Sequence, residues 1–223
     1  MKTANIIFLV VAIAILGFVV WAGGSQKPEA TSEPVTATTT PAETNLSETK
    51  NTNKESMTKA TITTNQGIIT LELFADQSPK TVENFVTLAR KGFYDSTRFH
   101  RVIKGFMIQG GDPLSKDLSM KSRWGTGGPG YTIPDEFNSG DELYKTGYKR
   151  GILAMARTQE PNSGGSQFFI MHQDYPLLPP EYTIFGKVTS GLDVVDIIAT
   201  IKTEGSPTDR PLEDMIIQKI TIE

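Results

Sequence analysis

The pattern of apolar and polar residues divides the chain into three zones. Residues 6–22 are uncharged and almost wholly aliphatic, and residues 25–58 are mostly Thr, Ser, Glu, Asn and Pro. That middle zone holds too few apolar side chains to offset the entropy lost on ordering it, so we expect a disordered linker. We therefore predict an N-terminal anchor or signal segment over residues 1–24, the linker over 25–58, and a folded domain over 59–223.

The folded domain is expected to be mainly β. Apolar runs at residues 60–64 and 68–74 flank Asn65-Gln66-Gly67, which is typical of a hairpin turn. Further short runs predict strands over residues 99–108 (interrupted at Gly105), 152–156, 167–171, 183–188 and 214–222. Many short strands of this kind favour a closed barrel.

Two segments have helical spacing instead. The first runs from a cap at Ser78, through Pro79 in its first turn, to Gly92, and the second spans residues 192–201. Each places its apolar residues on one face: Val82, Phe85, Val86 and Ala89 in the first, and Val194, Val195, Ile198 and Ile201 in the second. We expect these helices to cap the barrel and residues 112–130 to form a long loop.

The apolar segment at residues 6–22 has two interpretations. As a helix it spans roughly 25 Å, near the lower limit for crossing a bilayer. Trp21 at the expected interface favours an uncleaved anchor. Val20 and Ala22 instead resemble the small-residue pattern of a signal cleavage site, so both interpretations stay open. Lys2 is the only early charge, which places the rest of the chain outside the cytoplasm.

Composition excludes several kinds of chemistry. With 22 Lys and Arg against 25 Asp and Glu, the net charge is −3, and we expect no nucleic-acid partner. The chain has no cysteine, which excludes disulfides, thiolate chemistry and a lipid-modified anchor. His100 and His172 lack the spacing of a metal pair, and Ser163 and Ser166 lie in a glycine-rich turn rather than a nucleophile elbow.

Three further patterns have simple explanations. Residues 125–130 match G-x-G-x-x-G, but no helical pattern follows them, so we expect a glycine loop and no dinucleotide. His172 with Asp174 could belong to a hydrolytic triad, but no serine motif supports one. Asp135, Glu136, Asp141 and Glu142 form an acidic stretch that is most simply a solvated loop. We expect neither a metal nor a cofactor.

Two longer strings are far more specific. They are FHRVIKGFMIQGGD at residues 99–112 and GSQFFI at residues 165–170, supported by ELFAD, PKTVENF, GTGGPGY and IFGKV. Residue by residue, a core or surface role is the simpler interpretation. Together, the strings resemble the cyclophilin family of peptidyl-prolyl cis-trans isomerases over about residues 60–223, and its bacterial-type members in particular. The resemblance implies an eight-stranded antiparallel β-barrel closed by two helices, which acts on Pro-containing polypeptides without a cofactor.

The resemblance also assigns site residues. It implies that Arg101 is the catalytic arginine and that Gln109 contacts the substrate backbone. The implied substrate-binding residues are Phe106, Met107, Ala156, Arg157, Gln167, Phe169, Leu177, Leu178 and Tyr182. Arg157 departs from a common asparagine, and Leu177 and Tyr182 replace the tryptophan and histidine of many eukaryotic members. Residues 114–123 are extra.

The expected function is isomerisation of X–Pro bonds in proteins that fold outside the cytoplasm. We expect a monomer that is membrane-anchored, or secreted if the N-terminal segment is cleaved. Two alternatives are a non-catalytic chaperone module that binds Pro-containing segments and a tethered structural protein. Arg101 discriminates between the first alternative and an enzyme, because a simple binding module has no need of a cation aimed at the proline nitrogen.

Overall fold

The computed structural model describes residues 58–138, 140–145 and 147–223. The predicted anchor or signal segment and almost all of the predicted linker lie outside these residues. Within the described part of the chain, no helix is both long and apolar enough to span a bilayer.

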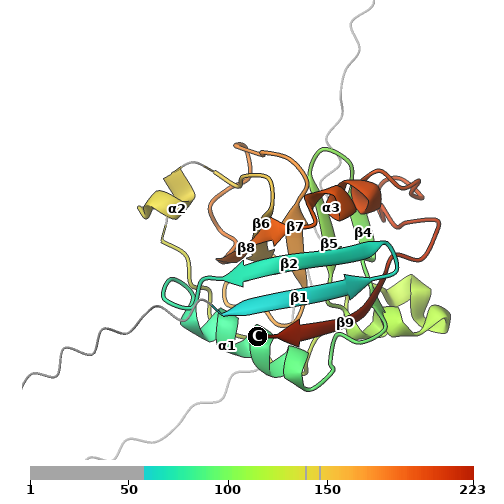
Figure 1. The fold of residues 1–223 in the computed structure, drawn as a ribbon, viewed down its shortest axis with the longest axis horizontal. Coiled ribbons are helices and arrows are strands. Elements are labelled where there is room, and N and C mark those ends of the chain that lie inside the picture. Colours follow the sequence, from blue (N-terminus) through green and yellow to red (C-terminus); the bar gives the residue numbers. More distant parts are fainter. Residues whose placement is uncertain (1–57, 139, 146) are drawn as a thin grey trace, which may run out of the picture. The chain divides into compact units, whose positions relative to one another are not determined.

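One curled antiparallel sheet organises the described residues (Figure 1). Its nine strands are β1 (Lys59–Thr64), β2 (Gly67–Leu73), β3 (Thr97–Arg98), β4 (Arg101–Ile103), β5 (Met107–Gly110), β6 (Ile152–Met155), β7 (Phe168–Met171), β8 (Ile184–Ser190) and β9 (Ile216–Ile222). Their order across the sheet is β3-β9-β1-β2-β8-β6-β7-β5-β4. The predicted hairpin is confirmed as β1 and β2, which are joined at Gly67 with a φ of 139° that favours glycine.

The mainly β prediction is confirmed, whereas the closed eight-stranded barrel stays a prediction. Among the described residues no ladder joins the two end strands, β3 and β4. Only Phe99 and His100 separate them in sequence. The N–H of Phe99 donates to the Met215 carbonyl (2.9 Å), and the N–H of His100 donates to the Gln109 carbonyl (3.0 Å). The predicted strand at residues 99–108 is therefore split, because its chain changes partners and then turns at Gly105.

Both predicted helices are confirmed as α1 (Pro79–Arg90) and α3 (Leu192–Ala199). The structure adds one turn of helix, α2 (Glu142–Lys145), and two 3₁₀ segments, η1 (Pro113–Lys116) and η2 (Leu118–Arg123). The prediction of a plain loop over residues 112–130 is thus wrong in its first half. Elements of one or two turns have too few residues to reveal a periodic pattern.

The N-terminus of α1 is capped by a different residue from the one predicted. Ser78 makes no capping bond, since its hydroxyl donates instead to the Ile184 carbonyl (2.8 Å). The carboxylate of Glu136 accepts from the N–H of Lys80 (3.0 Å) and of Thr81 (2.7 Å). Glu136 therefore satisfies free amides of the first turn and lies at the positive end of the helix dipole. The prediction that its acidic stretch is only a solvated loop is wrong at this residue.

Alternation along the strands separates two apolar clusters on opposite faces of the sheet. Ile108, Leu153, Phe168 and Ile170 join residues of α1 and α3 in the main core. Met107, Ala154, Phe169 and Met171 form a second cluster with Tyr144 and Tyr148. All four residues of β7 are buried, which explains why that strand is a continuous apolar run in the sequence. The second cluster supplies the apolar wall of the candidate site.

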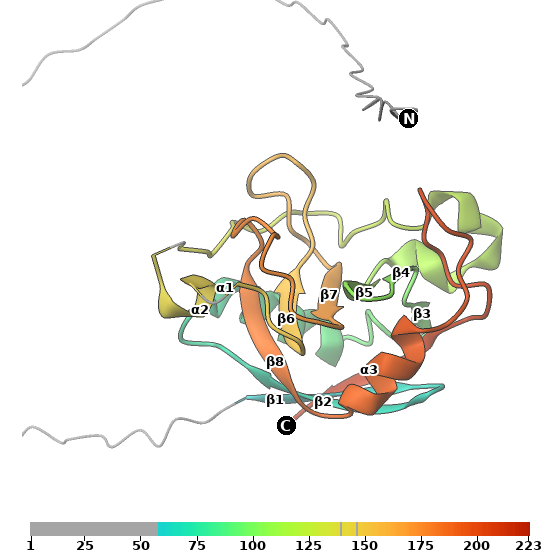
Figure 2. The same cartoon turned by 90° about the horizontal axis from the view of Figure 1, so that it is seen from above.

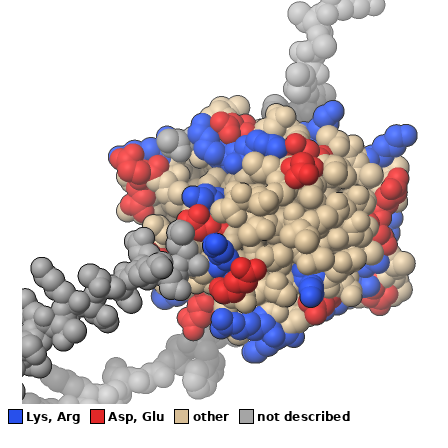
Figure 3. Space-filling model, in the orientation of Figure 1, with Lys and Arg blue, Asp and Glu red and all other residues tan. Residues whose placement is uncertain are grey.

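Charges of opposite sign lie close together on the domain surface. Figure 3 shows one face, on which Lys and Arg lie beside Asp and Glu around a central area without charged residues. Ion pairs of the domain include Lys187–Glu72 (3.2 Å) and Arg150–Asp196 (2.7 Å). Neighbouring opposite charges largely cancel at a distance, so the face in Figure 3 does not have the extended basic surface typical of nucleic-acid binding.

The cap of α1 gives a stability prediction. We expect Glu136→Ala to lower the free energy of unfolding by about 1–2 kcal/mol, because it removes a helix cap together with its charge–dipole interaction. The melting temperature should fall by about 3–6 °C. Glu213→Ala, which removes the same charge from an exposed loop residue, is the matched control. Equal melting temperatures for the two variants would contradict the capping role.

Candidate active site

A cavity of about 550 Å³ lies beside β4 and β5. All but two of the predicted site residues line it: Arg101, Phe106, Met107, Gln109, Ala156, Arg157, Phe169, Leu178 and Tyr182. Gln167 lines an adjoining hollow of about 440 Å³, which shares Gln109, Ala156 and Arg157 with the first. Leu177 lines neither of the two and is 84% exposed, whereas its neighbour Leu178 packs against the second cluster.

Strand register explains why these side chains meet. Across β4, β5, β7 and β6, Arg101 pairs with Gln109, Gln109 with Phe169, and Phe169 with Ala154. Residues directly opposite each other in an antiparallel sheet project to the same face. The register therefore sets a cation, an amide and an aromatic ring side by side, all facing away from the main core.

Arg101 has few partners of its own. Its side chain is 41% exposed, and its Nε lies 3.6 Å from Oδ2 of Asp209, which is longer than an ordinary hydrogen bond. Within the described residues, Asp209 is the only acidic side chain that forms an ion pair with it. The N–H groups of the guanidinium can therefore donate to a molecule bound in the cavity.

Gln109 is oriented by Gln167. The amide nitrogen of Gln109 donates to Oε1 of Gln167 (2.9 Å). Gln167 in turn donates to the carbonyls of Gly125 (3.0 Å) and Gly127 (2.8 Å). The predicted glycine loop is thus confirmed as a loop, and the side chain of Gln167 holds it beside Gln109.

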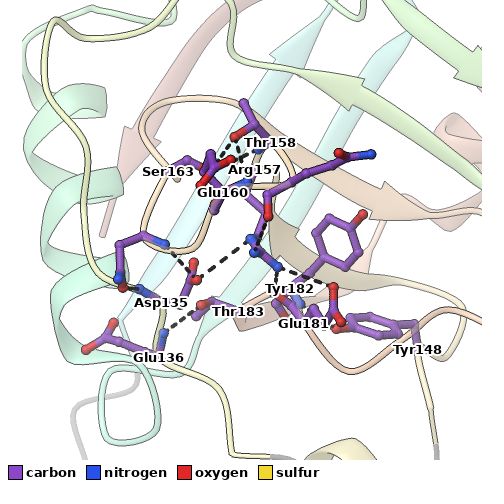
Figure 4. Close-up of polar contacts among 12 residues, drawn as sticks. Asp135, Glu136, Tyr148, Arg157, Thr158, Glu160, Ser163, Glu181, Tyr182 and Thr183 are labelled. Carbon is purple, nitrogen blue, oxygen red and sulfur yellow. Dashed lines mark hydrogen bonds and ion pairs between the residues drawn. The ribbon is translucent and has the colours of Figure 1, made fainter. Parts of the chain in front are cut away.

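Arg157 supports the wall of the site rather than projecting freely into it (Figure 4). Its side chain is only 8% exposed, and its Nη1 donates to the Glu181 carbonyl (3.2 Å). Its Nε lies 3.7 Å from Oδ2 of Asp135, which also accepts from the N–H of Asn162 (2.8 Å). The guanidinium thereby links three loops. This leaves the main chain as the part of Arg157 available to a substrate.

The aromatic wall is held in the same way. Tyr148 donates through its hydroxyl to the Tyr182 carbonyl (2.9 Å), and that hydroxyl accepts from the N–H of Tyr182 (3.0 Å). Burial raises the pKa of Tyr148, so the hydroxyl remains a neutral donor. The ring of Tyr182 meets that of Phe169 edge-on at 5.5 Å. This arrangement keeps the apolar side of the cavity rigid.

His172 fixes the turn that carries Phe106. Its N–H donates to the Phe106 carbonyl (2.8 Å), and its Nδ1 accepts from the N–H of Gly105 (2.8 Å). Its Nε2 lies 3.3 Å from Oδ1 of Asp196. Asp174, considered above as a triad partner, instead pairs with Lys149 (3.1 Å). The contacts of His172 therefore give it a structural role in this turn.

His100 is a buried cavity residue that sequence reasoning did not assign to the site. It is 4% exposed, and neither ring nitrogen has a hydrogen-bond partner within the described residues. Burial lowers its pKa to about 4, although the charge of Asp112 acts in the opposite direction. The imidazole is therefore neutral at physiological pH. Within the described chain, no group of three or more His, Cys, Asp or Glu converges as a metal site.

Sequence reasoning also missed one wall of the cavity. Ser122 and Trp124 come from η2 and the residue that follows it, and Pro207, Thr208 and Arg210 come from the connection between α3 and β9. The only indication in the sequence was the set of extra residues at 114–123. Nothing in the sequence pairs them with a segment more than eighty positions away.

Comparison with known proteins adds independent findings. Residues 59–222 match the family described as cyclophilin type peptidyl-prolyl cis-trans isomerase/CLD. The chain is 46% identical over 162 residues to the peptidyl-prolyl cis-trans isomerase CYP18-1 of Arabidopsis thaliana, covering 73% of this chain and 94% of that protein. It is 41% identical over 181 residues to peptidyl-prolyl cis-trans isomerase B of Streptomyces anulatus, covering 74% and 95%.

A solved structure has the same fold. It is a Cryptosporidium parvum cyclophilin type peptidyl-prolyl cis-trans isomerase, crystallised in the presence of the dipeptide Ala-Pro. The TM-score is 0.63 at 37% sequence identity, and the match covers 74% of this chain and 98% of that one.

Burial of His100 predicts a pH-dependent stability. The unfolded chain protonates this residue near pH 6.5, but the folded chain does so only at about pH 4. Protons therefore favour the unfolded state in this window, and stability falls as the pH is lowered through it. Between pH 7.5 and 5, wild type should lose about 2 kcal/mol more in urea unfolding than His100→Gln. Parallel pH profiles for the two proteins would contradict this.

Proposed function

Since this chain belongs to the cyclophilin-type peptidyl-prolyl cis-trans isomerases, we propose that it isomerises X–Pro bonds within the 550 Å³ cavity, with Arg101 as the catalytic residue. One observation carries the proposal. Arg101, whose ion pair with Asp209 is long, lines the same cavity as Phe106, Met107 and Phe169. A cation beside a ring-sized apolar pocket is what this reaction requires.

The reaction is a rotation rather than a bond cleavage. Resonance in the X–Pro amide gives a barrier of roughly 18–20 kcal/mol, so the uncatalysed change takes tens to hundreds of seconds. No nucleophile, acid–base pair or metal is needed. A catalyst must bind the twisted amide more tightly than either planar form.

Arg101 meets that requirement through the proline nitrogen. In the twisted amide this nitrogen loses conjugation and regains a lone pair, to which a guanidinium N–H donates. Arginine suits the task because it is always protonated and its donors are fixed in one plane. The interaction is strong only in the twisted state, because the planar amide nitrogen has no free lone pair. It therefore lowers the barrier rather than merely tightening binding.

The arginine cannot account for the whole acceleration. A charge-assisted hydrogen bond contributes about 1.5–3 kcal/mol. A rate increase on the order of 10⁵ needs about 7 kcal/mol. We assign the remainder to positioning: Phe106, Met107 and Phe169 hold the proline ring still while Gln109 fixes the chain on one side. Leu178 and Tyr182 complete the apolar wall.

The proposed substrates are Pro-containing polypeptides, which are held along the strand edge at Ala156 and Arg157 through main-chain contacts. The Cryptosporidium parvum relative crystallised with Ala-Pro supports this choice. Gln167 acts indirectly through Gln109 and the glycine loop. Leu177, at 84% exposure, is at most a rim contact for a longer peptide.

The proposed setting is the outer side of a membrane. Residues 6–22 would tether the domain through the linker at residues 25–58, or would be removed on export near Ala22. Proteins that fold there are delayed by slow proline isomers. We also propose a bacterial-type monomer whose sheet closes as a barrel. Support for the bacterial type comes from Leu177 and Tyr182, which replace the tryptophan and histidine of many eukaryotic members.

Arg101→Ala tests the catalytic assignment. We expect the isomerisation rate of a proline peptide to fall at least a hundredfold, or about 3 kcal/mol, because the charge-assisted bond to the twisted amide is lost. Arg90→Ala, which removes a cation from the last turn of α1, is the matched control. Unchanged turnover in Arg101→Ala would refute the assignment. Retained peptide binding with no turnover in wild type would favour the non-catalytic chaperone module.

The N-terminal proposal has its own test. Mass spectrometry should find either the full chain in the membrane fraction, as expected for an anchor, or a chain that begins just after Ala22 in the material released outside the cytoplasm. Recovery of the intact chain only from the cytoplasmic fraction would contradict both forms of the proposal.

A further inference from the structure

The end of η2 with Trp124, together with the connection between α3 and β9, forms a second half of the active-site cavity. We call Ser122, Trp124, Pro207, Thr208 and Arg210 the Trp124 compartment. Figures 1 and 2 show its two source segments, η2 and the connection between α3 and β9, next to each other at the same end of the domain. The apolar half of the cavity is formed by β5 and β7 with the loop that precedes β8. Arg101 borders both halves, because its partner Asp209 lies between Thr208 and Arg210 in sequence.

Ion pairs hold the Trp124 compartment together. Nζ of Lys121 lies 3.1 Å from Oε1 of Glu204, and Nη1 of Arg210 donates to Oε2 of Glu204 (3.0 Å). Two cations also contact the indole: the guanidinium carbons of Arg210 and Arg98 lie 5.6 Å and 5.4 Å from the centroid of a Trp124 ring. A wall fixed in this way loses little entropy when it binds a ligand.

The lining of the cavity carries cations and no acid. The guanidinium groups of Arg101 and Arg210 line it, and no Asp or Glu is among the described residues of the lining. Glu204 and Asp209, which pair with Arg210 and Arg101, lie outside the lining. The side chain of Arg210 is 12% exposed, and its Nη1 is the atom that pairs with Glu204. Guanidinium donors in a partly buried hollow favour a carboxylate.

We propose that the Trp124 compartment is a subsite for an acidic side chain, Asp or Glu, next to the proline of the client. The proline ring fills the apolar half, and the neighbouring carboxylate pairs with Arg210 while its methylene stem packs on Trp124. The hollow at Gln167 lies at the Ala156 end, so the peptide has room to continue in the other direction. The inference rests on the proposed isomerase function and adds a substrate preference to it.

The test compares matched peptides with the full-length protein. Four proline peptides carry Glu or Gln, either directly before or directly after the proline. At one of the two positions, we expect Glu to raise kcat/KM about fivefold over Gln, as for a partly exposed charge pair. The gain should appear in KM, and it should shrink in 0.5 M salt because salt screens such pairs.

Three variants test whether Arg210 causes the preference for Glu over Gln peptides. Arg210→Gln should abolish the gain, so that kcat/KM is equal for the Glu and Gln peptides when the two are compared within this variant. Arg210→Lys keeps the charge but not the planar fork, and should retain part of the gain. Lys219→Gln makes the same charge change on the exposed face of β9, and should keep all of it.

The proposal is overturned if wild type treats Glu and Gln peptides alike at both positions. It is also overturned if the gain survives in Arg210→Gln or is lost in Lys219→Gln. Absent turnover of every peptide would instead count against the isomerase function. Calorimetric titration of the same peptides then decides on the subsite, because the Glu peptide must still bind more tightly than its Gln partner.

Discussion

The cross-strand row of Arg101, Gln109 and Phe169 is the constraint on which the site depends. The β4–β5 hairpin and the distant strand β7 must pair in one register for this row to exist. A slip of one residue would turn each side chain to the opposite face. Arg101 would then point into the main core, where an unpaired charge is very costly. The burial of Ile108 and Phe168 on the opposite face therefore also fixes the geometry of the site.

The supporting contacts serve the same end. His172 holds the turn that carries Phe106, Gln167 orients Gln109, and Arg157 ties together the loops around Tyr182. None of these contacts provides a reactive group. Each contact restricts a side chain or a loop before the substrate binds, so less conformational entropy is lost on binding. A reaction that consists of rotating one bond gains mainly from such preorganisation.

Much of the fold follows from local patterns in the sequence. The hairpin at Gly67 and the helices α1 and α3 come from the alternation of apolar residues and from turn residues, both of which are local. Most site residues were assigned from the long sequence strings around Arg101 and Phe169. These strings resemble a family of known fold, whereas periodicity alone says nothing about which distant residues meet.

Long-range contacts were not predictable in this way. Glu136 caps α1 from more than fifty residues away, and the Trp124 compartment joins segments that no local pattern relates. Serine is a common N-cap residue, but the hydroxyl of Ser78 donates to the Ile184 carbonyl instead of capping the helix. Leu177 was assigned because it stands where many eukaryotic members of the family have tryptophan, but its side chain is exposed to solvent.

The central claim is that Arg101 favours the twisted amide over both planar forms. It is tested most directly by NMR exchange spectroscopy on a proline peptide held saturated by the protein, comparing wild type with Arg101→Lys. We predict rapid cis–trans exchange of the bound peptide in wild type and a rate at least tenfold slower in the variant, at similar affinity, because lysine lacks the fixed planar donors. Equal exchange rates in the two bound states would contradict the account.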